Sequence, residues 1–445
     1  MKRYLILGTG ISGIGAAHVL LARGDAVVIS DVRDLQDANE AQTLSAAGAE
    51  FIIGPQTEAL LDGIDVVIPA PVISVENPVL AAARARNIRI CPEIELAYEI
   101  AKMSIYAVTG TNGKTTTTTL LRDMLAAGGI KTEAAGNIGC SLSETCFRLP
   151  KEAIVAAEIS SFQLEMAEIF RPAAAVILNI TPDHLERHHT MEAYVAAKAK
   201  IFENMAKDSY LLLNCDDPYC RKLAETAPCK VAWLSTTKEV SEGAFLSGRH
   251  LRIRIEEKET DLCDMDFLPI PGMHNVQNVL AAAFLATLAG VSADCIREAI
   301  AAYRPLSHRI EFIREVAGVS YYDDSKATNT DSVEKALSAF TRPVTLICGG
   351  YDKGTPLEDF MHFVRSHAKH VVLMGAAAKR FAEAAAQAGI TETVVAKNME
   401  DAVRKAASLS KEGEIVLLSP ACSSFDSYKS YGERGDDFRK RVSAL

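Results

Sequence analysis

Short runs rich in Val, Ile and Leu recur along this chain of 445 residues, and longer segments of helical periodicity separate them. The apolar residues in each run are nearly continuous, as expected of strands that are buried on both faces of a parallel sheet. The helical segments fit crossover connections between such strands. The pattern predicts an α/β fold with mostly parallel sheets. The predicted strands cover residues 4–8, 27–31, 65–70, 105–110, 154–159, 174–180, 210–214, 344–350, 370–375 and 414–420.

The pattern falls into three blocks, which predict domains at residues 1–92, 93–303 and 304–445. The second block ends after two predicted helices, one over 277–289 and a short one that starts at Asp294. Residues 230–266 have a short alternating pattern with many charges, which predicts an antiparallel excursion inside the second block.

Composition excludes several other classes of protein. The formal charge of −10 argues against a nucleic-acid-binding surface, which is usually basic. Ten scattered cysteines without a C-x-x-C pair argue for reduced thiols rather than a disulfide framework or zinc site. The first apolar run leads directly into a glycine turn, which predicts a strand and not a signal peptide. No run of roughly 18 apolar residues occurs, so we expect no membrane span and a cytoplasmic location.

The motif with the clearest chemistry is a phosphate loop between a predicted strand and a predicted helix. Backbone N–H groups of such a turn form an anion cradle, and the helix N-terminus adds positive potential. The lysine suits the β- and γ-phosphates of a nucleotide, and the hydroxyl after it suits Mg²⁺. The spacing is shorter than the general pattern, since Val108 stands where a glycine is usual. The loop residues are Gly110, Thr111, Asn112, Gly113, Lys114, Thr115 and Thr116.

Acidic and imidazole groups follow two further strands. Glu158 ends one run, and Asp183 and His184 follow the next. Carboxyl ends of parallel strands face the crevice where ligands bind, so these groups are candidate metal or substrate contacts. His188 and His189 are expected to face solvent.

A second glycine pattern, Gly8-x-Gly10-x-x-Gly13, follows the first strand, and Asp31 comes about 20 residues later. Taken alone, it predicts a dinucleotide site and a NAD-dependent oxidoreductase. That hypothesis leaves the phosphate loop unexplained. A regulatory or transport NTPase is a further alternative, and it would hydrolyse ATP without an amino acid.

Six motifs together resemble the Mur ligases, in the order and spacing of that family over about the whole chain. They are GTNGKTT at 110–116, EISSFQLE at 158–165, TPDH at 181–184, GMHN at 272–275, His308-Arg309, and DSKATN at 324–329. The resemblance implies three domains: a Rossmann-like N-terminal domain that binds a uridine nucleotide, a phosphate-loop ATPase with a parallel sheet, and a Rossmann-like C-terminal domain that binds the amino acid. It also implies ATP and two Mg²⁺ ions as cofactors.

The resemblance assigns a role to each matching position. Lys114, His184 and Lys198 are implied as catalytic, and Lys198 matches a lysine that is carbamylated in the family. ATP is implied to contact the loop residues together with Asn275, Arg309, Asp324 and Lys326. The metal ligands would be Thr115, Glu158, His184 and Lys198. The uridine precursor would contact Ser12, Asp31, Arg33 and Asn137. The amino acid would contact Thr328, Lys353, Ser424, Phe425 and Tyr431.

Within the family, the segment LSPACSSFD at 418–426 resembles the members that add D-glutamate. The implied substrates are UDP-N-acetylmuramoyl-L-alanine and D-glutamate, joined through an acyl phosphate in peptidoglycan synthesis. Neither nucleic acid nor a membrane is an expected partner. A sibling ligase that adds another amino acid, or one that adds glutamate to folate, is the nearest alternative.

Overall fold

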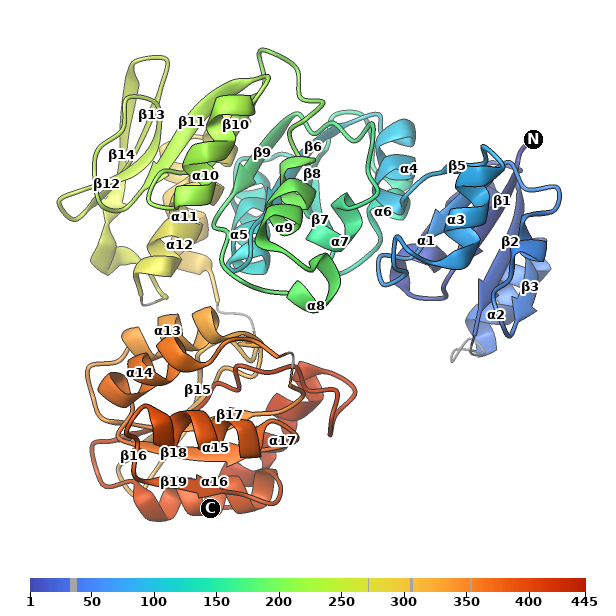
Figure 1. Ribbon diagram of the computed structural model, residues 1–445. Helices are drawn as coiled ribbons and strands as arrows, with labels where there is room; N and C mark the ends of the chain where they lie inside the picture. The colour runs from blue at the N-terminus through green and yellow to red at the C-terminus, as the bar shows by residue number, and fades with distance from the viewer. Residues whose placement is uncertain (33–37, 271, 305–306, 353) are drawn as a thin grey trace. The chain divides into compact units, whose positions relative to one another are not determined.

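The computed structural model describes residues 1–32, 38–270, 272–304, 307–352 and 354–445. Its described strands form three sheets, which follow one another along the chain (Figure 1). Contacts divide the chain into two compact units. The first contains residues 1–180, 190–268 and 276–303, and the second contains 181–189, 269–275 and 304–445. An α/β fold with mostly parallel sheets is confirmed, whereas the three sets of domain bounds stay predictions.

The first sheet is entirely parallel and has the strand order β3-β2-β1-β4-β5. This order matches the first five strands of the 3-2-1-4-5-6 order of a doubly wound dinucleotide-binding fold. Its strands are β1 (Arg3–Leu7), β2 (Ala26–Asp31), β3 (Glu50–Ile53), β4 (Val66–Pro69) and β5 (Arg89–Ile90). Helices α1 (Ile11–Ala22), α2 (Ala38–Ala46) and α4 (Glu93–Ile100) pack on one face, and α3 (Pro78–Ala85) packs on the other.

The second sheet has nine strands in the order β14-β13-β12-β11-β10-β9-β6-β8-β7. The pairs from β7 to β12 are parallel, and β12 to β14 are antiparallel. The expected antiparallel excursion is therefore confirmed for its last three strands, but its first strand, β11, pairs in parallel on both sides. The strands are β6 (Ser104–Thr109), β7 (Thr132–Gly136), β8 (Ile154–Glu158), β9 (Ala174–Ile177), β10 (Tyr210–Asn214), β11 (Lys230–Ser235), β12 (Gly243–Ser247), β13 (His250–Ile255) and β14 (Lys258–Asp264).

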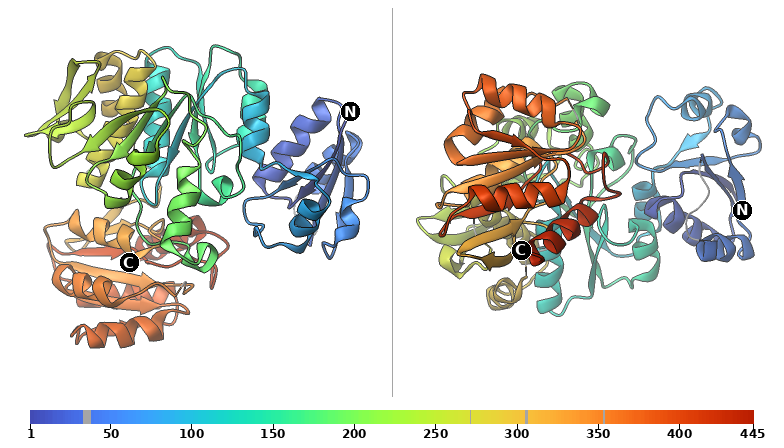
Figure 2. Two further views of the ribbon diagram at one scale, coloured as in Figure 1. Left: turned by 45° about the horizontal axis from the view of Figure 1, so that its top comes forward. Right: turned by 90° about the horizontal axis from the view of Figure 1, so that it is seen from below.

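Helices cover both faces of this sheet (Figure 2). The core of one face includes apolar side chains of α4, α6, α7, α9 and α10. On the other face, α5 packs against β7 and β8, and α12 packs on α5. The helices are α5 (Lys114–Ala127), α6 (Leu142–Arg148), α7 (Ser161–Leu164), α9 (Met191–Ala199), α10 (Pro218–Leu223), α11 (Met273–Leu288) and α12 (Ala293–Ala302). The short α8 (Leu185–His188) precedes α9.

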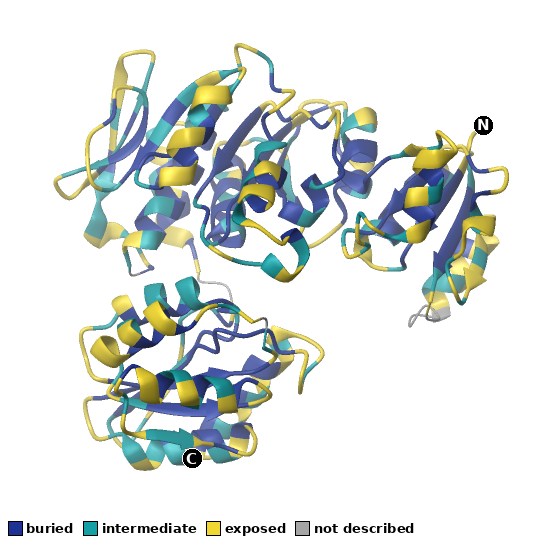
Figure 3. Ribbon diagram, in the orientation of Figure 1, coloured by how far each residue is buried: buried dark blue, intermediate teal, exposed yellow. Residues whose placement is uncertain are grey.

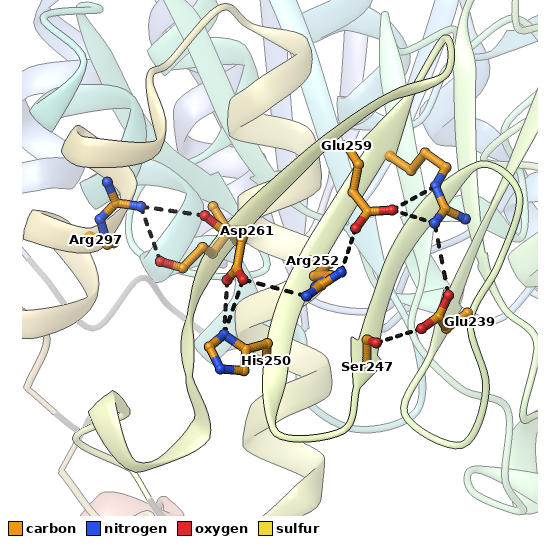
Figure 4. Close-up of polar contacts among 9 residues, drawn as sticks. Glu239, Ser247, His250, Arg252, Glu259, Asp261 and Arg297 are labelled. Atoms are coloured by element: carbon orange, nitrogen blue, oxygen red, sulfur yellow. Dashed lines mark hydrogen bonds and ion pairs between the residues drawn. The ribbon is translucent and has the colours of Figure 1, made fainter.

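A network of ion pairs joins side chains at the antiparallel end of the second sheet (Figure 4). Arg252 pairs with Glu259 at 2.7 Å and with Asp261 at 3.7 Å, and His250 contacts Asp261 at 3.1 Å. These side chains are partly exposed to solvent. Charged side chains on an edge strand discourage pairing with a second chain, so this network protects the exposed edge of β14 from such pairing.

The third sheet has the order β15-β16-β20-β17-β18-β19, and only the β15–β16 pair is antiparallel. Helices α13, α14 and α15 cover one face, and α16 and α17 cover the other. Figure 3 shows the buried strands between helices whose outer faces are exposed. The elements are β15 (Glu311–Val316), β16 (Val319–Asp323), α13 (Thr330–Ser338), β17 (Val344–Gly349), α14 (Glu358–His367), β18 (His370–Met374), α15 (Ala378–Gln387), β19 (Thr393–Val395), α16 (Met399–Leu409), β20 (Ile415–Leu418) and α17 (Tyr431–Ser443).

All ten cysteines are free thiols. Among the described residues, no helix has both the length and the apolar character needed to cross a membrane.

Candidate active site

The phosphate loop occupies the turn between β6 and α5, at the carboxyl end of the central part of the second sheet. Gly110 and Gly113 adopt positive φ angles of +154° and +86°. A Cβ atom on Gly113 would lie 2.2 Å from Oδ1 of Asn278. Only glycine fits there without strain or displacement. The turn places successive backbone N–H groups at the N-terminus of α5, where an anion is stabilised.

Asn179, two residues after the end of β9, holds the loop from one side. Its Oδ1 accepts the N–H of Asn112 at 2.8 Å, and its Nδ2 donates to the Asn112 carbonyl at 3.1 Å. The Asn179 carbonyl also accepts the N–H of Thr111 at 2.9 Å. The sequence predicts a functional role for Asp183 and His184 after this strand, but it gives no signal for the supporting role of Asn179.

Two lysines meet the carbonyls of the loop. Lys114 Nζ donates to the carbonyls of Gly110 at 2.9 Å and Thr111 at 2.7 Å. Lys198, from α9, is 1% exposed, and its Nζ donates to the Gly110 carbonyl at 2.9 Å. By contrast, Lys200 donates to the carbonyl of Glu165. The fold therefore brings Lys198 to the loop, although most helix lysines face solvent.

Tyr194, one turn before Lys198 on α9, was not expected at the site. Its hydroxyl lies 3.0 Å from the hydroxyl of Thr111, and its ring centroid lies 4.7 Å from Lys198 Nζ. An isolated tyrosine in a helical pattern gives no signal of such a role.

Strand β8 ends beside β6 and carries Glu158, which is 2% exposed. Its Oε1 accepts a hydrogen bond from Nδ2 of Asn137 at 2.7 Å. Its Oε2 is buried and has no hydrogen-bond partner in the described part of the chain. A buried carboxylate oxygen without a donor is costly, and a hard cation would satisfy it. Thr115, which is buried and has a hydroxyl group, lies in the first turn of α5, so the residues present fit an oxygen-ligated Mg²⁺.

The first glycine turn has a different set of contacts. Gly8 has a φ angle of +104°, and a Cβ on Gly13 would lie 2.2 Å from the Gly8 carbonyl oxygen. Asp31, at the end of β2, accepts the N–H of Thr9 at 2.8 Å and the Thr9 hydroxyl at 2.7 Å. Ser12 lies in the first turn of α1 and is partly exposed. Arg33, the other expected contact, lies outside the described residues.

In the second unit, three of the expected nucleotide residues, Arg309, Asp324 and Lys326, lie near the ends of β16 and β20. Asp324 accepts the Ser419 hydroxyl at 2.7 Å, and burial raises the pKa of its carboxyl to about 7. Arg309 has a buried Nε without a hydrogen-bond partner among the described residues. Lys326 Nζ lies 3.4 Å from the hydroxyl of Tyr431 and 5.2 Å from its ring centroid. Asn275 is also buried.

The expected amino-acid contacts flank the same strand ends. Ser424 is buried, whereas Phe425 is 71% exposed and Thr328 is partly exposed. Tyr431 begins α17. Lys353 lies outside the described residues.

Arg434 was missed by the sequence analysis, although it fixes this region. Its guanidinium is 1% exposed and donates to Ser325 Oγ and to the carbonyls of Ser325, Cys422 and Ser423. Burial lowers the pKa of Arg434 to about 10, so the group stays charged at neutral pH.

The segment 181–189 also belongs to the second unit. Asn329 Nδ2 donates to Asp183 Oδ2 at 3.0 Å. His184 has a left-handed backbone with a φ angle of +55°, and its imidazole lies between Asp183 and Glu186. The predicted metal ligands are thus divided, with Thr115, Glu158 and Lys198 in one unit and His184 in the other.

His188 and His189 were both expected to face solvent. This expectation is wrong for His188, which is buried, and confirmed for His189, which is exposed.

Strand β6 carries the phosphate loop where the chain order of the sheet reverses. Glu158 ends the strand on one side, and Asn179 follows the end of the strand on the other. In open α/β sheets, ligands bind at such switch points. These features define a phosphate-loop nucleotide-binding enzyme of the α/β class.

Comparison with known proteins gives the family. The model of the MurD-like Mur ligase N-terminal domain matches residues 2–92, that of the Mur ligase middle domain 108–286, and that of the Mur ligase glutamate ligase domain 308–422. The UDP-N-acetylmuramoylalanine–D-glutamate ligases of Thermoanaerobacter sp. (strain X514) and Pelotomaculum thermopropionicum are 38% and 40% identical. Each alignment covers 100% of this chain and 98% of the relative. The chain belongs to the Mur ligase family.

Solved structures agree on the fold. UDP-N-acetylmuramate–alanine ligase MurC from Thermotoga maritima aligns with a TM-score of 0.62 at 20% identity, over 100% of this chain and 99% of its own. The MurF ligase of the same organism, in complex with ADP, aligns with a TM-score of 0.59 at 17% identity, over 94% and 95%. The three-domain architecture is therefore confirmed, and the full-length relatives and the family models show that the chain is an ATP-dependent ligase. The oxidoreductase predicted from the first glycine turn alone is set aside.

Proposed function

We propose that this enzyme joins D-glutamate to the alanine carboxyl group of UDP-N-acetylmuramoyl-L-alanine in the cytoplasm, as a step of peptidoglycan synthesis. The names of full-length relatives at 36–40% identity support this substrate pair. The observation that carries the chemistry is the phosphate loop, with Lys114 and Lys198 on its carbonyls and Glu158 at the neighbouring strand end.

The reaction has two steps. The precursor carboxylate attacks the γ-phosphorus of ATP, the bond from this phosphorus to the bridging oxygen breaks, and an acyl phosphate forms as ADP leaves. The amine of D-glutamate then attacks the acyl carbon, loses a proton, and expels inorganic phosphate as the amide forms. In the first step two anions must approach each other, so positive groups are needed around the triphosphate.

The chain supplies those groups at defined positions. The N–H groups at the start of α5 and Lys114 would hold the β- and γ-phosphates. Thr115, Glu158, His184 and a carbamylated Lys198 would hold two Mg²⁺ ions, because carbamylation turns an amine into an anionic oxygen ligand. Bound Mg²⁺ adds Lewis-acid stabilisation of charge on the phosphoryl oxygens.

The second unit would bind the rest of the nucleotide and the amino acid. Asp324 suits the ribose hydroxyls, and Asn275, Arg309 and Lys326 suit the base and phosphates. We assign the D-glutamate pocket to Thr328, Lys353, Ser424, Phe425 and Tyr431. The precursor would contact Ser12, Asp31, Arg33 and Asn137.

The amine must be neutral to attack, and free α-amino groups titrate near pH 8, so a base would help. His184 is the candidate, as an alternative to its role as a metal ligand, because an imidazole nitrogen bound to Mg²⁺ has no lone pair left to accept a proton. A His184→Ala enzyme that keeps its full rate between about pH 7 and 9 would remove this residue from the mechanism.

Phosphate release tests the function directly. The purified enzyme is given ATP, Mg²⁺ and UDP-N-acetylmuramoyl-L-alanine, with D-glutamate, L-glutamate, L-lysine or no acceptor. Release only with D-glutamate is expected. Equal release without an acceptor indicates a simple NTPase, and release with L-lysine or L-glutamate indicates a sibling ligase.

A further inference from the structure

Asn137 follows the last residue of β7 and donates two hydrogen bonds to Glu158 on the adjacent strand β8. Its Nδ2 donates to Glu158 Oε1 at 2.7 Å, and its backbone N–H donates to the Glu158 carbonyl at 2.8 Å. The side chain of Asn137 is otherwise exposed, whereas Glu158 is buried. The resemblance assigns Asn137 only to the nucleotide precursor, so its contact with Glu158 has no assigned role.

The backbone around Asn137 is shaped for this close approach. Gly136 has a φ angle of +102°, and a Cβ there would lie 2.4 Å from the Glu158 carbonyl oxygen. The N–H of Gly136 donates to the Cys140 carbonyl at 3.0 Å, which closes the turn behind Asn137. A larger residue at position 136 would push the two strands apart, so the local geometry fixes where the Asn137 amide lies.

The two oxygens of Glu158 are therefore not equivalent. Oε1 is held by the Asn137 amide, and Oε2 is buried without a hydrogen-bond partner in the described part of the chain. A carboxylate anchored through one oxygen presents the other in a fixed direction. Carboxylates that bind metals are commonly oriented by such hydrogen bonds, and loss of the partner weakens metal binding.

We infer that Asn137 is a positioning residue that aims Glu158 Oε2 at the Mg²⁺ of the triphosphate site, in addition to its predicted contact with the precursor. This inference rests on the proposed function, because it requires Glu158 to be a metal ligand. The exposed position of Asn137 allows both roles at once, since its hydrogen bond to Glu158 Oε1 uses one amide hydrogen.

Binding of Mn²⁺ tests the inference without turnover. Mn²⁺ is titrated into the full-length protein with ATP and without precursor, and bound metal is followed by electron paramagnetic resonance. Asn137→Ala is expected to weaken Mn²⁺ binding roughly 10- to 100-fold. Because the precursor is absent, loss of a precursor contact cannot produce this effect.

Asn137→Leu is the second variant, since it keeps nearly the same side-chain shape and removes only the amide. It should weaken Mn²⁺ binding to a similar extent. Asn204→Ala is the control. Asn204 donates to the Glu168 carbonyl in the same unit, and its loss should leave Mn²⁺ affinity unchanged.

Glu158→Gln separates the two levels of the proposal. If this variant loses Mn²⁺ binding while Asn137→Ala and Asn137→Leu both bind like the wild type, the inference is overturned and the metal site stands. If Glu158→Gln itself binds Mn²⁺ normally, both the metal site and the role of Asn137 are overturned.

Discussion

The chain contains two glycine turns of similar local design, one after β1 and one after β6. Each leads from a buried parallel strand into a helix, and each uses left-handed glycine, at Gly8 and at Gly113. The side chains that reach them differ. In the first turn, the Asp31 carboxylate accepts the N–H and hydroxyl of Thr9. In the second, two lysines contact the loop carbonyls.

This difference shows that the backbone turn alone does not choose the ligand. A carboxylate at the first turn occupies a backbone donor and adds negative charge, which suits a ligand that also offers N–H donors, such as the uracil of the precursor. At the second turn, the Lys114 ammonium group and the N–H groups at the start of α5 suit the higher charge of a triphosphate. The family resemblance leads to the same conclusion, because it assigns the first turn to the uridine precursor and not to a dinucleotide.

The largest expected effect concerns the lysine that only the second turn has. Lys114→Ala should lower kcat by about a hundred- to thousand-fold, which corresponds to about 3–4 kcal/mol of lost stabilisation of the transferring phosphoryl group. Phosphate release measures the rate, and circular dichroism checks that the chain is folded. The exposed Lys102 provides the control as Lys102→Ala, with an unchanged rate expected. A Lys114→Ala enzyme with near-normal turnover would contradict the proposal that this lysine makes the second turn suited to a triphosphate.

The next effect concerns glycines in equivalent turns. Gly113→Ala meets a positive φ angle and a neighbouring oxygen 2.2 Å away, so we expect a loss of about 2–3 kcal/mol in the free energy of unfolding. Gly10→Ala is the matched change in the first turn. Gly10 has a φ angle of −75°, and no atom lies within 4 Å of the added Cβ. The free energy of unfolding of Gly10→Ala should therefore equal that of the wild type. Thermal unfolding compares the two, and equal melting temperatures would contradict the steric argument.

A third prediction concerns α4, whose apolar residues belong to the cores of both turn-bearing sheets. Glu93 at its start accepts the N–H of Ser143 at 2.6 Å, and burial raises the pKa of the Glu93 carboxyl to about 6. A raised pKa means that the folded state holds the proton more tightly than the unfolded state. Stability from this group is therefore present at low pH and lost as pH rises from about 4.5 to 6, by about 2 kcal/mol.

Glu93→Gln carries no titrating group, so its unfolding free energy should lack this decline between about pH 4.5 and 6. Chemical denaturation at several pH values measures the difference. Parallel pH profiles for the wild type and the variant would show that Glu93 does not titrate in this window.

The smallest effect concerns the carboxylate of the first turn. Asp31→Asn removes a charge-assisted hydrogen bond to Thr9, so we expect the KM for the precursor to rise about tenfold, or about 1.4 kcal/mol. The KM for ATP should not change, because the second turn is intact. Steady-state kinetics with each substrate varied in turn gives both values. A parallel rise in both would mean that the two turns do not act on separate ligands.

Much of the architecture was accessible from local patterns. The apolar runs located ten strands, and the phosphate loop was placed between β6 and α5 because glycine spacing and flanking periodicity are local properties of the chain. Short or partly exposed strands such as β3, β5 and β19 were missed, since they have few apolar residues to produce a pattern. The parallel pairing of β11 was also missed, because pairing depends on distant partners.

The sequence by itself determined the α/β class, the two glycine turns and the family, since these depend on residues that are close together along the chain. Only the tertiary structure decided that Lys198 is buried against the Gly110 carbonyl while Lys200 is not, and that Tyr194 and Asn179 hold the loop. It likewise paired Asn137 with Glu158, 21 residues away. The physical reason is that burial and hydrogen bonding are set by which strands become neighbours, and no local pattern encodes that choice.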